Sequence, residues 1–168
     1  MLTKHFTDYP GAHHRSVHLI DIENLLGGPT FTSADAARLE VEYRRVAALA
    51  AGDHVIVACS HFAAPAAWFG WGRGRRLIRS GPDGADLALL GVLEGEGVAS
   101  RFDRVVVASG DGIFAEACAR LQGEGREVTV VSRGQDSLSL ELAFAVRDTR
   151  FLAQDALPGA AAALRLAA

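Results

Sequence analysis

Short apolar runs alternate with longer amphipathic stretches along the chain. The short runs are rich in β-branched residues, which is typical of buried strands, whereas the longer stretches repeat apolar residues at helical spacing. This pattern predicts five strands, at 17–22, at 54–59, around Leu77 and Ile78, at 104–108 and at 127–132. Helices are predicted at about 34–51, from Pro82 past Leu93, at about 112–123 and from Ser137 to about Asp148.

Alternating strands and helices predict an α/β fold of three layers, in which helices cover both faces of a central, mostly parallel five-stranded sheet. Right-handed crossovers place the carboxyl ends of the strands at one edge, where open α/β sheets bind their ligands. We expect one domain at 16–152, with an irregular leader at 1–15 and an alanine-rich tail at 153–168.

Acidic and amide side chains follow the strands at this edge. Asp21 ends the first strand, with Asn24 three residues later, and Asp111 follows the fourth strand in a Ser-Gly-Asp-Gly turn. Asp86 lies near the start of a predicted helix, on the same face as Leu89. We therefore expect the three aspartates to converge.

Three carboxylates that converge without a lysine repel one another and raise each other's pKa. Mg²⁺ or Mn²⁺ prefers such oxygen ligands, and it can hold a phosphodiester and lower the pKa of an attacking water. The sequence thus predicts Asp21, Asp86 and Asp111 as metal ligands and, with Asn24, as catalytic residues. Structural alternatives exist, because Asp111 can cap a helix and Asp86 can interact with a helix dipole.

A basic and aromatic segment lies between the strand predicted at 54–59 and the helix predicted from Pro82. Its arginines and aromatic residues are Arg73, Arg75, Arg76, Arg79, Trp68, Phe69 and Trp71. Guanidinium groups contact phosphates and aromatic rings stack on bases, so the segment predicts binding of single-stranded nucleic acid beside the acidic cleft. Ser109 is assigned to nucleic-acid contact as well. The alternative is a solvated loop with partly buried aromatic rings.

Composition limits the partners of the chain. The formal net charge of −3 provides no general basic field, so any anion site must be local. Cys59 and Cys118 fall in apolar patterns, which predicts buried, reduced thiols in a cytoplasmic protein. No apolar run reaches the length of a signal peptide or a membrane span. A homo-oligomer is compatible with the sequence.

Several short motifs occur in a characteristic order. They are Leu19-Ile20-Asp21-Ile22-Glu23-Asn24-Leu25, Gly84-Ala85-Asp86-Leu87-Ala88-Leu89, Val107-Ala108-Ser109-Gly110-Asp111-Gly112-Ile113-Phe114, Glu127-Val128-Thr129-Val130-Val131 and Ser137-Leu138. With these motifs the chain resembles the NYN domains, a branch of the PIN-like nucleases, over roughly 16–152. The resemblance implies a strand order of 3-2-1-4-5 and a metal-dependent ribonuclease site of clustered acids that cleaves single-stranded RNA.

One position departs from the family pattern. In the family, a second acidic residue often stands two positions after the aspartate of Ser-Gly-Asp. In this chain that position is Ile113. A catalytically weak or inactive NYN-like RNA-binding module is therefore the main alternative. A haloacid-dehalogenase-like phosphatase fits poorly, because Glu23 replaces its second aspartate and Lys4 is the only lysine. A P-loop NTPase is excluded by the lack of a Gly-Lys-Ser/Thr motif.

Overall fold

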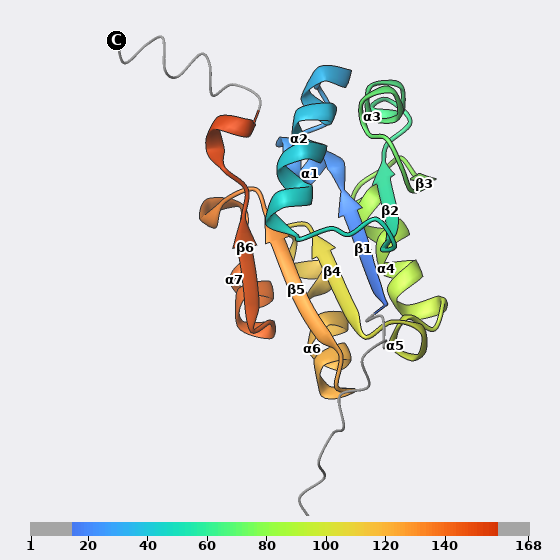
Figure 1. Cartoon of the computed structure of the whole chain (residues 1–168), viewed down its shortest axis with the longest axis vertical. Helices are drawn as coiled ribbons and strands as arrows, with labels where there is room; N and C mark the ends of the chain where they lie inside the picture. Colours follow the sequence, from blue (N-terminus) through green and yellow to red (C-terminus); the bar gives the residue numbers. More distant parts are fainter. Residues whose placement is uncertain (1–14, 158–168) are drawn as a thin grey trace, which may run out of the picture.

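Six parallel strands form the sheet at the centre of the computed structural model, which describes residues 15–157 (Figure 1). Their order across the sheet is β3-β2-β1-β4-β5-β6, and every neighbouring pair is parallel. The strands are β1 (Ser16–Asp21), β2 (His54–Cys59), β3 (Arg75–Ile78), β4 (Arg104–Ala108), β5 (Glu127–Ser132) and β6 (Asp148–Phe151).

Helices cover both faces of the sheet, which makes three layers (Figure 1). The first layer contains α1 (Ile22–Leu26), α2 (Ser33–Val46) and α3 (Ala64–Gly70). The other contains α4 (Gly84–Gly95), α5 (Val98–Arg101), α6 (Ala115–Gly123) and α7 (Leu140–Ala145). Single 3-10 turns lie at Gly112–Phe114, Gln135–Ser137 and Gln154–Ala156.

The alternation of side chains along each strand divides the core in two. In β4, Val105 and Val107 pack against α4 and α6, while Val106 and Ala108 pack against α1 and α2. Successive side chains of a strand point to opposite faces, so an entirely apolar strand needs a helical layer on each side. The continuous apolar runs of the sequence are explained by this burial.

The α/β class and the parallel sheet are confirmed, but the count of five strands is wrong. The additional strand is β6, whose first residue was predicted as the end of a helix and whose other residues were assigned to no helix or strand. It extends the sheet beyond β5 and leaves the order of the first five strands unchanged. The helix predicted from Ser137 is shorter than expected, since α7 ends at Ala145.

Two other boundaries differ from the sequence prediction. The first strand ends at Asp21 rather than Ile22, because the Asp21 carboxylate accepts a hydrogen bond from the Asn24 N–H at 3.0 Å and so begins α1. The long helix predicted to residue 51 ends at Val46, and Ala48 then adopts a left-handed conformation with φ of 52°. Both corrections come from local capping and backbone geometry.

The packed part of the chain continues past the predicted boundary at residue 152. Leu152 and Leu157 are both buried against α1 and α2. Most of the predicted leader and the remainder of the predicted tail lie outside the described residues. Within 15–157, none of the helices has the length and apolarity needed to cross a membrane.

Candidate functional site

The register of the sheet brings the ends of β1 and β4 together. Ile20 pairs with Ala108, so Asp21 lies at the level of Ser109, the first residue after β4. The helix α4 runs against the strand direction and begins at the same edge. Residues separated by ninety positions in sequence, such as Asp21 and Asp111, therefore reach one edge of the sheet.

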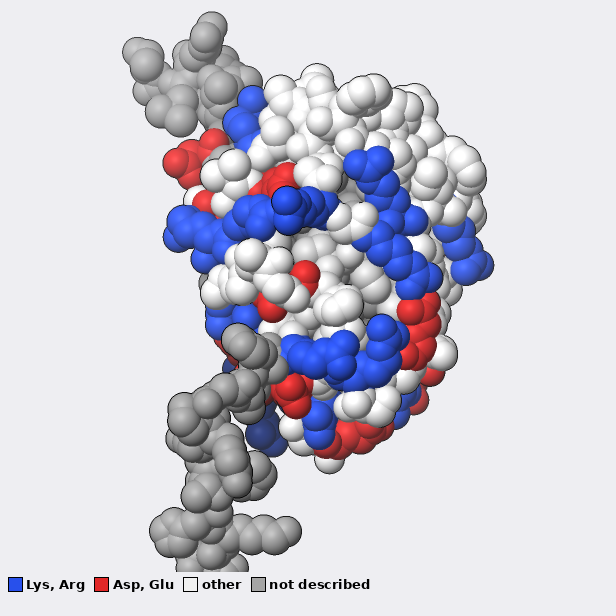
Figure 2. All heavy atoms as spheres, turned by 45° about the vertical axis from the view of Figure 1, so that its right-hand side comes forward, with Lys and Arg blue, Asp and Glu red and all other residues white. Residues whose placement is uncertain are grey.

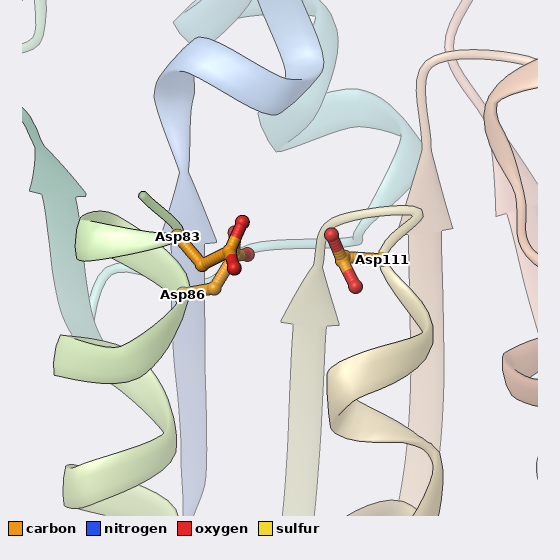
Figure 3. Close-up of side chains that lie close together, drawn as sticks. All are labelled: Asp83, Asp86 and Asp111. Carbon is orange, nitrogen blue, oxygen red and sulfur yellow. The ribbon is translucent and has the colours of Figure 1, made fainter. Parts of the chain in front are cut away.

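Three carboxylates meet there (Figure 3). One oxygen each from Asp83, Asp86 and Asp111 lies within 4.8 Å of the other two. Asp83 and Asp86 come from the start of α4, and Asp111 comes from the turn after β4 (Figure 3). Asp86 and Asp111 were predicted from the sequence to converge, whereas Asp83 was not assigned to the site.

Asp83 is placed by an unusual backbone conformation. It precedes α4 with φ of 53° and ψ of 26°, in the left-handed region that aspartate tolerates better than most residues. Its side chain makes no capping hydrogen bond to the helix, and it is exposed. The carboxylate is thus left available to the cluster. The sequence signals were the Pro-Asp-Gly turn and the three-residue spacing to Asp86.

Asp21 lies behind this cluster rather than in it. Asp21 is only 4% exposed, and its carboxyl group caps α1 and shares a hydrogen bond with Asp86. Asp86 is also buried, at 7% exposure. Two of the three predicted ligands are therefore in direct contact away from bulk water.

Burial controls the protonation of this pair. Loss of hydration, reinforced by the charge of Asp21 and the hydrogen bond to it, raises the pKa of Asp86 to about 8, with further contributions from Asp111 and Asp83. Burial also raises the pKa of Asp21, although the hydrogen bond from the Asn24 backbone opposes the shift. In the protein without a cation, a proton is therefore retained between the two carboxylates near neutral pH.

Asn24 and Ser109 hold the turn that carries Asp111. The Asn24 side-chain oxygen accepts a hydrogen bond from the Gly110 N–H at 3.0 Å, and the Ser109 hydroxyl accepts one from the Asp111 N–H at 3.1 Å. Ser109 has no exposed surface. Its assignment to nucleic-acid contact is therefore wrong, and its place in the structure is that of a support for the turn.

Gly110 fits closely between neighbouring segments. A Cβ atom at this residue would lie 1.7 Å from the carbonyl oxygen of Ser137. The carbonyl oxygen of Gly110 accepts a hydrogen bond from the Ser139 N–H at 2.8 Å. Together with the bond to Asn24, these contacts join the turn to α1 and to the segment before α7. No side chain larger than hydrogen fits at this position.

A cleft of about 360 Å³ is lined by Asp21, Asp83 and Asp86, and Asp111 lies beside it, within 4.8 Å of Asp83 and Asp86. Glu23 also lines it, but its carboxylate accepts hydrogen bonds from the Ser60 N–H at 3.1 Å and the Ser60 hydroxyl at 2.6 Å. Glu23 is thus held toward β2. Arg79 lines the same cleft and is the basic residue of the predicted segment that reaches the acids.

The other three predicted arginines lie elsewhere. Arg75 begins β3 beside Ile56, in the middle of β2, and pairs at 2.6 Å with Glu96, which follows α4. Arg73 lines a separate pocket beside Asp53. Arg76 lies over the ring of Trp68, 5.2 Å from its centroid. The expectation that Arg73, Arg75 and Arg76 flank the acidic cleft is wrong. Arg73 and Arg75 line pockets near the amino ends of the strands, and the Arg76 side chain packs on Trp68 although its backbone is level with the end of β1.

The aromatic residues on and around α3 include buried and exposed side chains. Trp71 is buried at 2% exposure and packs against Tyr43, so it belongs to the core. Phe69 is 89% exposed and Phe62 is 72% exposed, on and just before α3. On the face drawn in Figure 2, basic side chains form separate groups with acidic side chains between them rather than one continuous basic surface.

Arg133 is a basic residue at the acidic edge that the sequence analysis did not identify. It follows β5, and its guanidinium group packs against Gly27, which lines the cleft. A Cβ atom on residue 27 would lie 2.1 Å from an Arg133 nitrogen. Within residues 15–157, Arg133 forms no ion pair.

Comparisons with known proteins bear on the fold. No protein-family model matches the chain, and no curated protein matches it. A solved structure of a protein of unknown function from Vibrio parahaemolyticus RIMD 2210633 is similar, with a TM-score of 0.59 and 17% identity, over 88% of this chain and 98% of that one. At this identity the likeness shows the α/β fold alone.

Proposed function

We propose that the chain is a divalent-metal-dependent ribonuclease of the PIN-like, NYN type, acting on single-stranded RNA. The observation that carries the proposal is the convergence of Asp21, Asp83, Asp86 and Asp111, two of them buried, at the carboxyl edge of a parallel sheet. Among the described residues, none of the four forms an ion pair with a basic side chain.

The donor set fits a hard divalent cation. Carboxylate oxygens are the ligands that Mg²⁺ and Mn²⁺ prefer, and a buried carboxylate without a cation is costly to ionise. The ion would be held by Asp83, Asp86 and Asp111. Asp21, next to Asp86, would accept a hydrogen bond or add its negative charge to the site. When bound, the ion would supply Lewis-acid activation of a phosphodiester and of water.

The protein supplies the remaining functions from its own residues. Arg79 and Arg133, on the β3 and β5 sides of the acids, can each donate two hydrogen bonds to a phosphate. Asn24 and Ser109 fix the Asp111 turn through the hydrogen bonds described above. RNA phosphates would thus be held at two points beside the acids, and base identity would contribute little.

The NYN-type assignment rests on motifs and topology together. The strand order 3-2-1-4-5 implied by the resemblance is contained in the six-stranded sheet, and the Ser-Gly-Asp turn lies beside the end of β1. Asp83 supplies a third clustered carboxylate in a chain that has Ile113 at the family's second acid position. Both cysteines are free and buried, which fits the proposed cytoplasmic location.

An RNA-binding module without cleavage is the second candidate, and Ile113 favours it. Packed partly against the core of the α4 and α6 layer, Ile113 brings no charge to the acidic edge. This candidate predicts RNA binding through Arg79 and Arg133 with no effect of Mn²⁺ on the RNA. Cleavage therefore separates the two candidates.

The deciding experiment compares the parent chain with Asp111→Asn on single-stranded RNA in Mg²⁺ or Mn²⁺. Asn can still accept the capping hydrogen bond that Asp111 receives from the Ile113 N–H at 2.9 Å, so the fold should persist. We expect loss of cleavage and of the rise in Tm that Mn²⁺ gives. Glu124→Gln, an exposed change far from the cluster, is the control.

Retention of the parent's cleavage rate and of its Mn²⁺-induced Tm shift in Asp111→Asn would refute the proposed site. A parent chain that binds RNA and Mn²⁺ without cleaving the RNA would favour the binding module.

A further inference from the structure

A second polar cavity lies at the opposite edge of the sheet, beside the amino end of β5. Its volume is about 400 Å³. The pairing of β5 with β6 begins at Thr129 and Asp148, so Glu127 and Val128 have no partner residue on β6. The absence of these partners leaves a notch at the edge of the sheet, and the cavity lies in this notch. None of the residues that line the cavity also lines the acidic cleft.

Four arginines from three parts of the sequence line this notch. They are Arg104, Arg126, Arg147 and Arg150. The acidic residues in the lining are Glu127 and Asp148. Basic groups thus exceed acidic groups in a chain whose formal net charge is negative.

Two of the arginines are held by neighbouring groups. Arg150 donates to the Val46 carbonyl at 3.0 Å and to Asp148 at 3.0 Å. Arg126 lies 3.6 Å from Asp103. These interactions fix the two guanidinium groups at the rim of the notch and use only some of the five N–H donors that each carries.

The other two arginines lack a carboxylate partner in the described part of the chain. Arg104 donates a single hydrogen bond, to the Ala47 carbonyl at 2.9 Å, which orients its guanidinium group from the end of α2. Among residues 15–157, the Arg147 side chain forms no hydrogen bond or ion pair. The backbone N–H of Arg147 donates a hydrogen bond to the side-chain oxygen of Gln122 at 3.2 Å. Among the described residues, Arg104 therefore provides an oriented donor and Arg147 a solvent-exposed one, and neither pairs with a carboxylate.

We propose that this notch binds the phosphate group of a small phosphorylated ligand. Guanidinium groups match the geometry of phosphate oxygens and form charge-assisted, often bidentate, hydrogen bonds with them. The volume lies in the range of small-ligand sites, about 300–1,000 Å³, and is ample for a pyrophosphate or a mononucleotide. The proposal does not depend on the ribonuclease assignment, because β4 separates the notch from the acids by about 17 Å.

The test uses inorganic pyrophosphate as the probe and the full chain freed of divalent metals. Binding is measured by calorimetry at constant ionic strength. We expect Arg147→Gln to weaken pyrophosphate binding about tenfold or more, because it removes a bidentate donor without removing the backbone contact to Gln122. Arg147→Lys should fall between, since it retains the charge and loses the planar fork.

Two controls assign the effect to the notch. Arg73→Gln removes an equally exposed arginine from another pocket and should leave the affinity unchanged. Asp86→Asn should also leave it unchanged, because Asp86 lies at the other edge. Failure of pyrophosphate to bind the parent, or equal weakening by Arg147→Gln and Arg73→Gln, would overturn the proposal.

A short single-stranded oligonucleotide distinguishes the two sources of phosphate. We expect its affinity to be the same for the parent and for Arg147→Gln, as required if the notch takes a free small ligand. Should Arg147→Gln weaken the oligonucleotide while pyrophosphate binding is unaffected, the small-ligand proposal is wrong and the arginines contact a nucleic-acid backbone.

Discussion

At the carboxyl edge of the sheet, aspartates from three segments face one another, and two of them are almost completely buried. At the amino edge, four arginines surround a notch that is open to solvent. Both clusters arise because parallel strands begin at one edge and end at the other, so residues next to strand ends converge whatever their separation in sequence.

The difference between the two edges is burial. Removing water from Asp21 and Asp86 makes their ionisation costly and requires a proton or a cation between them. The arginines keep contact with water and with main-chain carbonyls, so no comparable requirement exists. The acidic edge should therefore respond to metal and pH more strongly than the basic edge responds to its anion.

The largest expected effect comes from Asp86→Asn. This change replaces a buried carboxylate ligand by an amide of nearly the same shape. We expect metal-dependent RNA cleavage to fall about 100-fold or more, since mutation of residues behind metal ligands already lowers metal affinity or activity 10–100-fold. The metal-free variant should unfold at an equal or higher temperature, because one repelling carboxylate is lost. Cleavage assays and calorimetric melting measure both, with Glu124→Gln as the control.

A variant that melts far below the parent would mean that Asp86 is needed for folding rather than for metal binding.

The second effect concerns pH. The pKa of Asp86 in the folded, metal-free protein is about 8, whereas in the unfolded chain it should be about 4. The folded state therefore binds more protons between these values, and the free energy of unfolding should decrease as pH rises through this window. Denaturant unfolding at about pH 5 and about pH 9 should show this decrease in the parent and a smaller one in Asp86→Asn.

Metal affinity should change in the opposite direction. The cation displaces the proton shared by Asp21 and Asp86, so its apparent affinity should increase up to about pH 8. A Mn²⁺ affinity that is constant over this range would place the ion away from Asp86.

The third effect tests which arginines belong to the acidic edge. Arg79→Gln and Arg133→Gln should each weaken RNA binding across sequences and reduce the salt slope by about one. Arg73→Gln, at the other edge, should change neither quantity. Binding titrations over a range of salt concentrations measure this, and equal effects of all three variants would show that RNA does not follow the cleft.

The smallest effect comes from Gly27→Ala. Gly27 and Gly28 have φ of 84° and 143°, so alanine at either position should cost about 1–3 kcal/mol in folding free energy. Only at residue 27 would the new methyl group displace the Arg133 guanidinium. Gly27→Ala should therefore weaken RNA binding a few-fold, and Gly28→Ala should not. Equal RNA affinities for the two variants would mean that Arg133 makes no contact.

Strand positions were predictable where burial leaves a strong signal. Runs such as Val105-Val106-Val107 need apolar side chains on both faces, and the pattern located them well. The sixth strand has no such run: Asp-Thr-Arg-Phe at 148–151 lies at the sheet edge, and none of its four residues is fully buried. An edge strand of this kind is specified by pairing with β5, which a local pattern does not contain.

The site was predictable to the extent that it follows strand ends. Asp21 and Asp111 were located by that rule, and Asp86 by its helical face. Asp83 required knowledge of a left-handed residue before α4, and Arg133 required the contact between β5 and α1. The arginine segment was placed wrongly because its direction depends on how β3 joins the sheet, which composition does not show.

Gly110 has a consequence for the way natural variants of this chain should be interpreted. Its neighbours leave no room for a side chain, and its two main-chain hydrogen bonds position the turn that carries Asp111. A homologous sequence could keep every aspartate and still lose the placement of Asp111 in the cluster through one substitution at this glycine. Inheritance of the acids alone is therefore a poor marker of inherited activity, and residue 110 should be compared first.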